Sequence, residues 1–198
     1  MTPQPPSSLV MGAPGSGKTT SLASYLKSNL SLFAIITEPG GVDSLLDEVR
    51  RKGYDMNLVH WAYMPASSPG WASLIKAGTL ANTMSYKDLA DVKFGIGREE
   101  QKALFKLFDL CQDLKDERTG KTYGPIERLG PTWAVALDSL SGLYDLVMQN
   151  CVGFKPNPHQ GEWGSAMGLE SNILLKLSAD ITSFFTVTCH IDRVIEEV

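Results

Sequence analysis

One glycine-rich octapeptide constrains this chain more than any other feature. Residues 12–19 are GAPGSGKT, which fits the pattern G-x-x-x-x-G-K-[ST] at every position. Glycines let the backbone wrap closely around phosphate oxygens, and successive N–H groups at a helix start supply positive potential. Lys18 is expected to contact the β- and γ-phosphates, and Thr19 to bind Mg²⁺. The loop predicts ATP and Mg²⁺ as cofactors, and its binding residues are Gly12, Ala13, Pro14, Gly15, Ser16, Gly17, Lys18, Thr19 and Thr20.

The composition is that of an ordinary globular chain. It has 198 residues, of which 43% are hydrophobic and 20% charged, and its net charge is −4. This length suits one domain, and the charge excludes a generally basic protein that coats nucleic acid, although not a local basic groove. No run approaches the ~18 apolar residues of a membrane span, and the first residues lack a secretory signal. We therefore expect a cytoplasmic protein without a membrane partner.

Three widely spaced cysteines form no CxxC pair, which argues against a disulfide scaffold or a zinc cluster. They are Cys111, Cys151 and Cys189. This usage indicates a reducing compartment, in which each cysteine serves as a small packing residue.

Apolar runs alternate with helix-permissive segments along the chain. The runs predicted to be strands are 8–11, 32–37, 58–63, 133–138 and 184–190. The segments predicted to be helices are 19–30, 42–52, 99–114, 140–150 and 166–179. Such alternation favours an α/β fold with a mostly parallel central sheet flanked by helices.

Two acidic residues end predicted strands, where a parallel sheet gathers its ligand-binding groups. Asp138 ends the run WAVALD and is the candidate for the Mg²⁺ shell. It is followed by Ser139 and not by the glutamate that many ATPases use as a base, so the base must come from elsewhere. Glu38 ends the strand that follows the loop helix, and we predict that it polarises the attacking water. The alternative is that Glu38 caps the next helix or is solvated.

This layout resembles that of RecA-like P-loop ATPases. The segments TEPGG, LDSLSGL and TCHID are similar to those of phage-encoded RecA-like ATPases of the single-strand-annealing and recombination type, and the resemblance covers residues 8–193. It implies that the strand ending in His190 lies between the strands that lead to Lys18 and Asp138. His190 matches the polar residue that senses the γ-phosphate, so Lys18, Glu38 and His190 are expected to be catalytic. A structural histidine is the alternative for His190.

The resemblance also implies partners. RecA-like proteins form rings or filaments in which a neighbour supplies a cation to the γ-phosphate, so we expect a homo-oligomer. The candidates for that cation are Arg193, Arg98 and Lys155. The implied activity is ATP hydrolysis coupled to single-stranded DNA in recombination, repair or replication, in a bacterial or phage-infected cell. Stacking and cationic candidates for DNA lie in the segment 152–164 and are Phe154, Lys155, His159 and Trp163, which could equally form a local hydrophobic anchor.

Two local basic clusters, at 50–52 and 115–121, are weaker candidates for DNA contact. The first fits a solvated helix end, where cations are favoured by the helix dipole.

The domain organisation is expected to be simple. We interpret residues 1–198 as one domain with a flexible lead-in at 1–7, and residues 64–131 as an insertion that determines the partner. Shorter predicted features are helices at 71–76 and 86–91, a hairpin or exposed loop at 115–131 and a loop at 154–164. The sequence stops eight residues after His190, which indicates a core cut close to its last motif and predicts weak ATPase activity in isolation.

Two other functions fit the same loop. GAPGSGKTT also occurs in nucleotide and small-molecule kinases, although no arginine-rich lid is apparent. The third hypothesis is a nucleotide-dependent assembly switch with little turnover.

Overall fold

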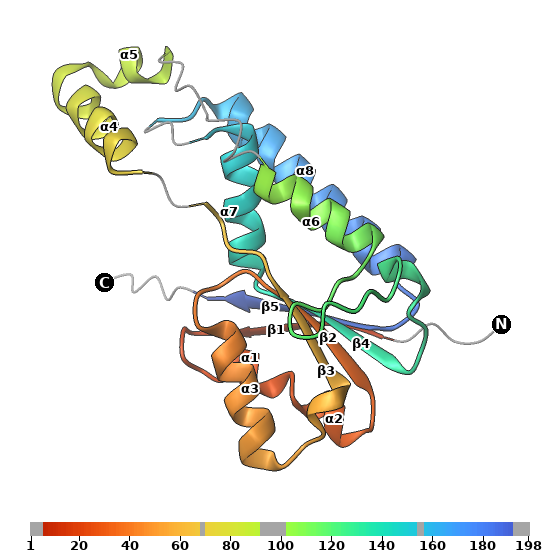
Figure 1. The fold of residues 1–198 in the computed structure, drawn as a ribbon. Coiled ribbons are helices and arrows are strands. Elements are labelled where there is room, and N and C mark those ends of the chain that lie inside the picture. The colour runs from red at the N-terminus through yellow and green to blue at the C-terminus, as the bar shows by residue number, and fades with distance from the viewer. Residues whose placement is uncertain (1–5, 68–69, 92–101, 154–156, 192–198) are drawn as a thin grey trace, which may run out of the picture.

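The computed structural model describes residues 6–67, 70–91, 102–153 and 157–191. Its centre is a sheet of five strands, all parallel, in the order β1-β5-β4-β2-β3. The strands are β1 (Ser7–Gly12), β2 (Ser31–Ile36), β3 (Val59–Tyr63), β4 (Trp133–Asp138) and β5 (Phe184–His190). Every predicted strand is therefore confirmed to within a residue or two, and all five carboxyl ends lie at one edge of the sheet (Figure 1).

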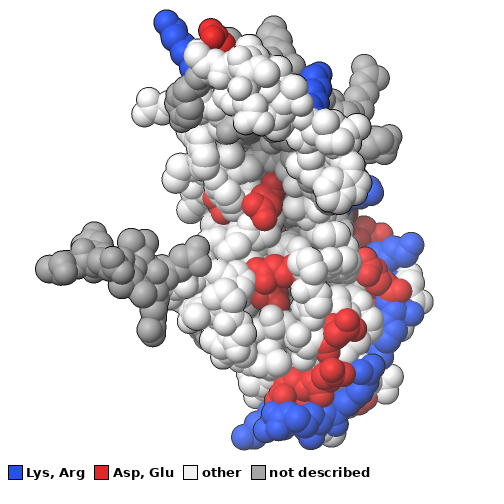
Figure 2. Space-filling view, turned by 90° about the vertical axis from the view of Figure 1, so that its left-hand side faces the viewer, with Lys and Arg blue, Asp and Glu red and all other residues white. Residues whose placement is uncertain are grey.

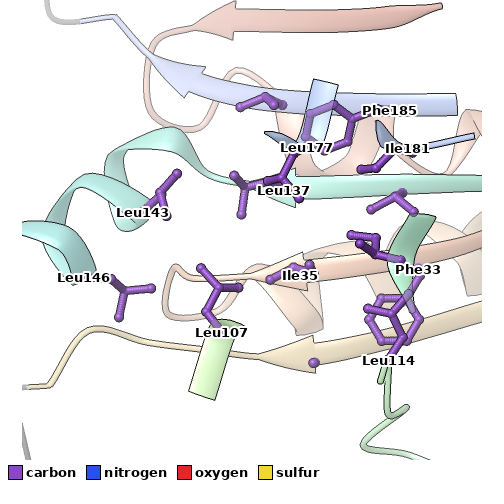
Figure 3. Close-up of a cluster of buried hydrophobic side chains, with 14 of the residues drawn as sticks. Phe33, Ile35, Leu107, Leu114, Leu137, Leu143, Leu146, Leu177, Ile181 and Phe185 are labelled. Atoms are coloured by element: carbon purple, nitrogen blue, oxygen red, sulfur yellow. The ribbon is translucent and has the colours of Figure 1, made fainter. Parts of the chain in front are cut away.

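Helices cover both faces of the sheet, which confirms the predicted α/β class. One face carries α1 (Lys18–Ser21), α2 (Ser24–Lys27) and α3 (Gly41–Lys52), and the other carries α6 (Lys102–Gln112), α7 (Leu140–Cys151) and α8 (Gln160–Asp180) (Figure 1). The buried strands alternate their side chains between two cores. Phe33, Ile35 and Leu137 face the α6–α7–α8 layer (Figure 3), whereas Ala34 and Ile36 face the α1–α3 layer.

Two helices stand away from this body. They are α4 (Trp71–Thr83) and α5 (Tyr86–Asp91), which pack against each other and project beyond α7 and the start of α8 (Figure 1). Both fall within the predicted insertion, and α4 runs seven residues past the predicted end at residue 76. Of the helices in the described ranges, none is long and apolar enough to cross a membrane.

The predicted helix at 19–30 is wrong in its continuity. The amides of Leu22, Ala23 and Tyr25 bond carbonyls three residues back, which tightens the chain into a turn between α1 and α2. Ser21 Oγ also donates to the Lys18 carbonyl, so a side chain competes with the helical ladder.

The predicted loop at 154–164 is also wrong over its last residues, because α8 begins at Gln160. His159 and Glu162 form a capping box, in which the Glu162 carboxylate accepts from the His159 amide at 2.6 Å. The two glycines of this turn, Gly161 and Gly164, therefore lie inside a helix that its cap stabilises.

The predicted hairpin at 115–131 closes through an antiparallel bridge between Lys115 and Thr122. It covers β3, the edge strand, because the Asp116 carboxylate accepts from the Trp61 amide and the Glu117 amide donates to the Trp61 carbonyl. Asp116 is fully buried, and its Oδ2 lies 3.3 Å from His60 Nδ1. A segment expected to be exposed therefore contains a buried polar cluster.

Two short 3₁₀ turns complete the described elements. They are η1 (Met56–Leu58) and η2 (Ile126–Arg128). Asp55 caps η1 by accepting from the Asn57 amide at 2.8 Å.

Candidate functional site

The glycine-rich loop joins β1 to α1 at the carboxyl edge of the sheet. Gly17 caps α1 with a φ of 87°, a left-handed conformation that glycine adopts without strain. A Cβ on Gly12 would lie 2.5 Å from Ser16 Oγ, so a larger residue there would require the Ser16 hydroxyl to move. Beside the loop lies a pocket of about 250 Å³, and its lining residues are Gly15, Gly17, Lys18, Thr19, Thr20, Glu38, Pro39, Gly40, Gly41, Ser44 and His190. Five of the nine predicted loop residues, Lys18 among them, thus share one pocket with Glu38 and His190, the other two predicted catalytic residues.

Lys18 folds back across the loop. Its side chain is buried, and Nζ donates to the carbonyls of Gly12 and Ala13 at 2.9 Å each. Nζ also lies 3.2 Å from His190 Nδ1. Among the described residues, no carboxylate pairs with this ammonium, which lies at the mouth of a backbone cradle where an anionic phosphate could replace the carbonyls.

Thr19 and Asp138 meet across the sheet edge. Thr19 Oγ1 donates to Asp138 Oδ2 at 2.6 Å, and Thr188 of β5 donates to the other carboxylate oxygen. Asp138 is buried, so these hydroxyls compensate for the water that its carboxylate loses. Hydroxyl and carboxylate oxygens are the donors that Mg²⁺ prefers, and Mg²⁺ is usually held by one or two carboxylates together with substrate phosphates. The predicted Mg²⁺ residues therefore lie together with suitable chemistry.

Glu38 contacts His190 and Ser139. Ser139 Oγ donates to Glu38 Oε1, and His190 Nε2 lies 2.5 Å from the same oxygen. The Lys18 ammonium can only donate, so His190 Nδ1 accepts from it and Nε2 carries the hydrogen that Glu38 accepts. A continuous chain therefore runs from the loop lysine through His190 to the carboxylate that we predicted to act as a base.

The start of α7 positions this carboxylate. Strands β2 and β4 pair so that Ile36 lies opposite Asp138, which places the residues after each strand side by side. Thr37 Oγ1 accepts from the Ser139 amide at 2.9 Å, and Ser139 Oγ accepts from the Gly142 amide. Ser139 thus caps α7 while it holds Glu38.

Sequence reasoning missed three members of this arrangement. Ser139 was visible only as the residue that replaces the usual glutamate, while Thr37 and Thr188 carried no signal beyond their places near strand ends. A serine between a strand and an apolar helical segment is a helix-cap signal, and it would have identified Ser139.

No protein-family model matches this chain, and the search of curated proteins gives no match either. Within the described ranges there is no group of three or more His, Cys, Asp or Glu side chains arranged to hold a metal ion, so a Mg²⁺ ion would rely on Thr19, Asp138 and phosphate oxygens.

The residues predicted to contact DNA are less closely grouped. Trp163 lies on α8, not in a loop, and its ring centroid is 6.1 Å from that of Tyr144. Burial and then the Glu38 charge raise the pKa of the nearby Asp145 carboxyl, and burial raises the pKa of Glu170. In Figure 2, which looks onto the carboxyl edge of the sheet, acidic side chains lie near the middle of the face and basic ones mostly at its periphery. The described part of this face is mostly uncharged and shows no basic track for a phosphate backbone.

Several predicted cations are outside the site or outside the described residues. Arg193, Arg98 and Lys155 lie outside the described residues, as does the predicted stacking residue Phe154. In the 50–52 cluster, arginines at the end of α3 pair with acids one turn earlier, as expected of a solvated helix end. In the 115–121 cluster, Arg118 donates to the Val59 carbonyl and stacks on Trp61. Both described clusters are therefore explained by local structure.

Proposed function

We propose that this chain binds Mg²⁺-ATP and hydrolyses it as a RecA-like P-loop ATPase. The observation that carries the proposal is the convergence of Lys18, the Thr19–Asp138 pair and Glu38 at one edge of the sheet. Together with the backbone of the glycine-rich loop, they supply the four parts that phosphoryl transfer to water requires: a phosphate cradle, a cation, a metal shell and a base.

Each residue then has a role. Lys18 would leave the loop carbonyls and neutralise phosphate oxygens. Thr19 would ligate Mg²⁺, and Asp138 would orient the Thr19 hydroxyl for that contact. The bound Mg²⁺ would stabilise the negative charge that develops on the transferred phosphoryl group. Glu38 would orient and polarise the attacking water. His190 contacts both Lys18 and Glu38, so it would couple movement of Lys18 to the phosphate with the position of Glu38.

The RecA-like assignment has its own support. Strand β5, which ends in His190, lies between β1 and β4, as the resemblance implied. His190 thereby stands between Lys18 and Glu38, whereas a strand at the sheet edge would have kept it away from both.

The test is phosphate release from ATP with and without Mg²⁺, combined with nucleotide binding by calorimetry. Lys18→Ala should abolish nucleotide binding, because the loop loses its cation. Lys27→Ala is the matched control, since Lys27 is an exposed lysine on α2. Nucleotide affinity in Lys18→Ala equal to that of Lys27→Ala would contradict the proposal.

The products separate this function from its alternatives. A kinase would transfer the phosphoryl group to an added acceptor and release little free phosphate, and an assembly switch would bind ATP with scarcely any turnover. Coupling to single-stranded DNA is the finer part of the proposal and rests on the resemblance. Fluorescence anisotropy with labelled single-stranded DNA and an ATP analogue tests this coupling. Absence of binding at low salt would exclude the DNA part of the proposal but not the proposed ATPase activity.

A further inference from the structure

Helix α4 presents an apolar row that no described part of the chain covers. Trp71, Leu74 and Ile75 are 81%, 45% and 67% exposed. Their spacing of three and four residues places them on one face of the helix, and Gly78 continues that face one turn later. Large exposed side chains at this spacing are how a helix anchors itself in an apolar groove.

An apolar groove lies on the same chain, between the C-terminal halves of α6 and α8. Its volume is about 380 Å³. Ile126, Leu177 and Ile181 are buried side chains of its lining. Four polar residues also line it, namely Gln112, Glu127, Asn172 and Lys176.

The groove suits an indole better than an aliphatic side chain. An indole combines a large apolar ring with a single N–H donor, which needs an acceptor when buried. Apolar lining receives the ring, while the amide oxygens of Gln112 and Asn172 and the carboxylate of Glu127 offer acceptors. Trp71 is the most exposed large hydrophobic side chain among the described residues.

The row and the groove lie at opposite ends of the described structure. In Figure 1, α4 lies beyond the N-terminal end of α8, whereas the groove lies at the far, C-terminal ends of α6 and α8. Two complementary surfaces at opposite ends of one chain generate a head-to-tail contact between copies, which closes into a ring or continues as a filament.

We infer that the occupant of the groove is Trp71 of a second copy of this chain, with Leu74 and Ile75 packing at the rim. The contact joins unlike surfaces, so each copy uses its α4 on one neighbour and its groove on another. This association does not depend on the proposed ATPase activity, because neither surface includes a residue of the nucleotide pocket.

Sedimentation velocity over a concentration series tests the contact. The wild-type chain should show mass that increases with concentration. Trp71→Ala should weaken association roughly thirtyfold or more, as loss of a central aromatic anchor does. Asn172→Arg should have a similar effect by obstructing the groove. Both positions are exposed, so neither change should impair folding.

Matched controls and a mixing experiment make the test specific. Met11→Ala removes an exposed apolar side chain from β1, and Ser171→Arg adds the same bulk to α8 outside the groove, so both should associate like wild type. An equimolar mixture of Trp71→Ala and Asn172→Arg retains one intact contact and should form a dimer that grows no further. A wild-type chain that stays monomeric, a Trp71→Ala variant that associates normally, or a mixture that stays monomeric would each overturn the inference.

Discussion

The hydroxyl of Thr19 donates a 2.6 Å hydrogen bond to Asp138 Oδ2, which ties the first turn of α1 to the end of β4. These residues are 119 positions apart in the sequence. Thr188 occupies the other carboxylate oxygen, so Asp138 is held from two neighbouring elements. In the proposed ATPase, this carboxylate fixes the direction in which Thr19 presents its oxygen to Mg²⁺.

Asp138→Asn should therefore weaken Mg²⁺ binding in the presence of nucleotide by about 10- to 100-fold, the usual cost of losing an outer-shell partner. The amide nitrogen of asparagine cannot accept from a hydroxyl as the carboxylate does. Titration of ATP hydrolysis with Mg²⁺ measures the change. Asp47→Asn on the exposed face of α3 is the control, and equal Mg²⁺ dependence in the two variants would remove Asp138 from the metal shell.

Glu38→Gln should keep nucleotide affinity and lower kcat by about 10²- to 10⁴-fold, because the amide cannot polarise water as a carboxylate does. Binding measured by calorimetry and turnover by phosphate release separate the two effects. Turnover close to wild type would assign the base to another group.

Ser139→Ala should lower kcat less than Glu38→Gln, because it removes a hydrogen bond that positions the carboxylate and leaves the carboxylate itself. Ser139→Thr retains the hydroxyl and should recover part of kcat, whereas a cap that serves stability alone would show no difference in kcat between the two. Denaturation midpoints of both variants report the loss of the α7 cap separately.

Gly142→Ala should destabilise the fold by about 1–3 kcal/mol, as overpacking of a full site does. A Cβ on Gly142 would lie 2.0 Å from Thr37 Oγ1 and 2.4 Å from Thr37 Cβ, so the turn that holds Ser139 would have to shift. Gly168→Ala in α8 is the matched control, because no atom lies within 4 Å of its Cβ and alanine favours helix by about 0.5–1 kcal/mol. Urea denaturation compares them, and similar midpoints would contradict the close packing.

The parallel direction of the strands and the convergence of the site residues at their carboxyl ends were predictable from the sequence. A phosphate-loop motif fixes where β1 ends, and acids at the ends of two apolar runs must then reach the same edge if the sheet is parallel. The motif and the two acid-terminated apolar runs are enough to predict that Glu38 and Asp138 lie near the loop.

The contacts that orient these residues were not predictable. Ser139 touches Glu38 only because β2 and β4 pair with Ile36 opposite Asp138, and strand register follows from packing across the whole sheet. The break between α1 and α2 and the early start of α8 have a different cause. Both depend on side-chain bonds, from Ser21 and Glu162, that compete with or complete a helix end and leave hydrophobic spacing unchanged.

The buried His60 should make stability depend on pH. Desolvation lowers the pKa of His60 below its usual 6.5, an effect that Arg118 and Lys121 reinforce and that the contact with Asp116 partly offsets. The unfolded chain therefore takes up a proton near pH 6.5 that the folded chain resists. The contribution of neutral His60 to the free energy of unfolding should be fully present above pH 6.5. It should decline as the pH falls through 6.5 towards the lower folded pKa, by up to about 1.4 kcal/mol per pH unit.

Urea midpoints between about pH 8 and about pH 5 measure this decline. His60→Gln keeps a polar side chain beside Asp116 and Tyr123 but cannot titrate, so its stability should fall less over this range than that of the wild type. His159→Gln, at the exposed cap of α8, is the control variant and should retain the wild-type slope. A His60→Gln variant with an unchanged slope would show that another group binds the proton on unfolding.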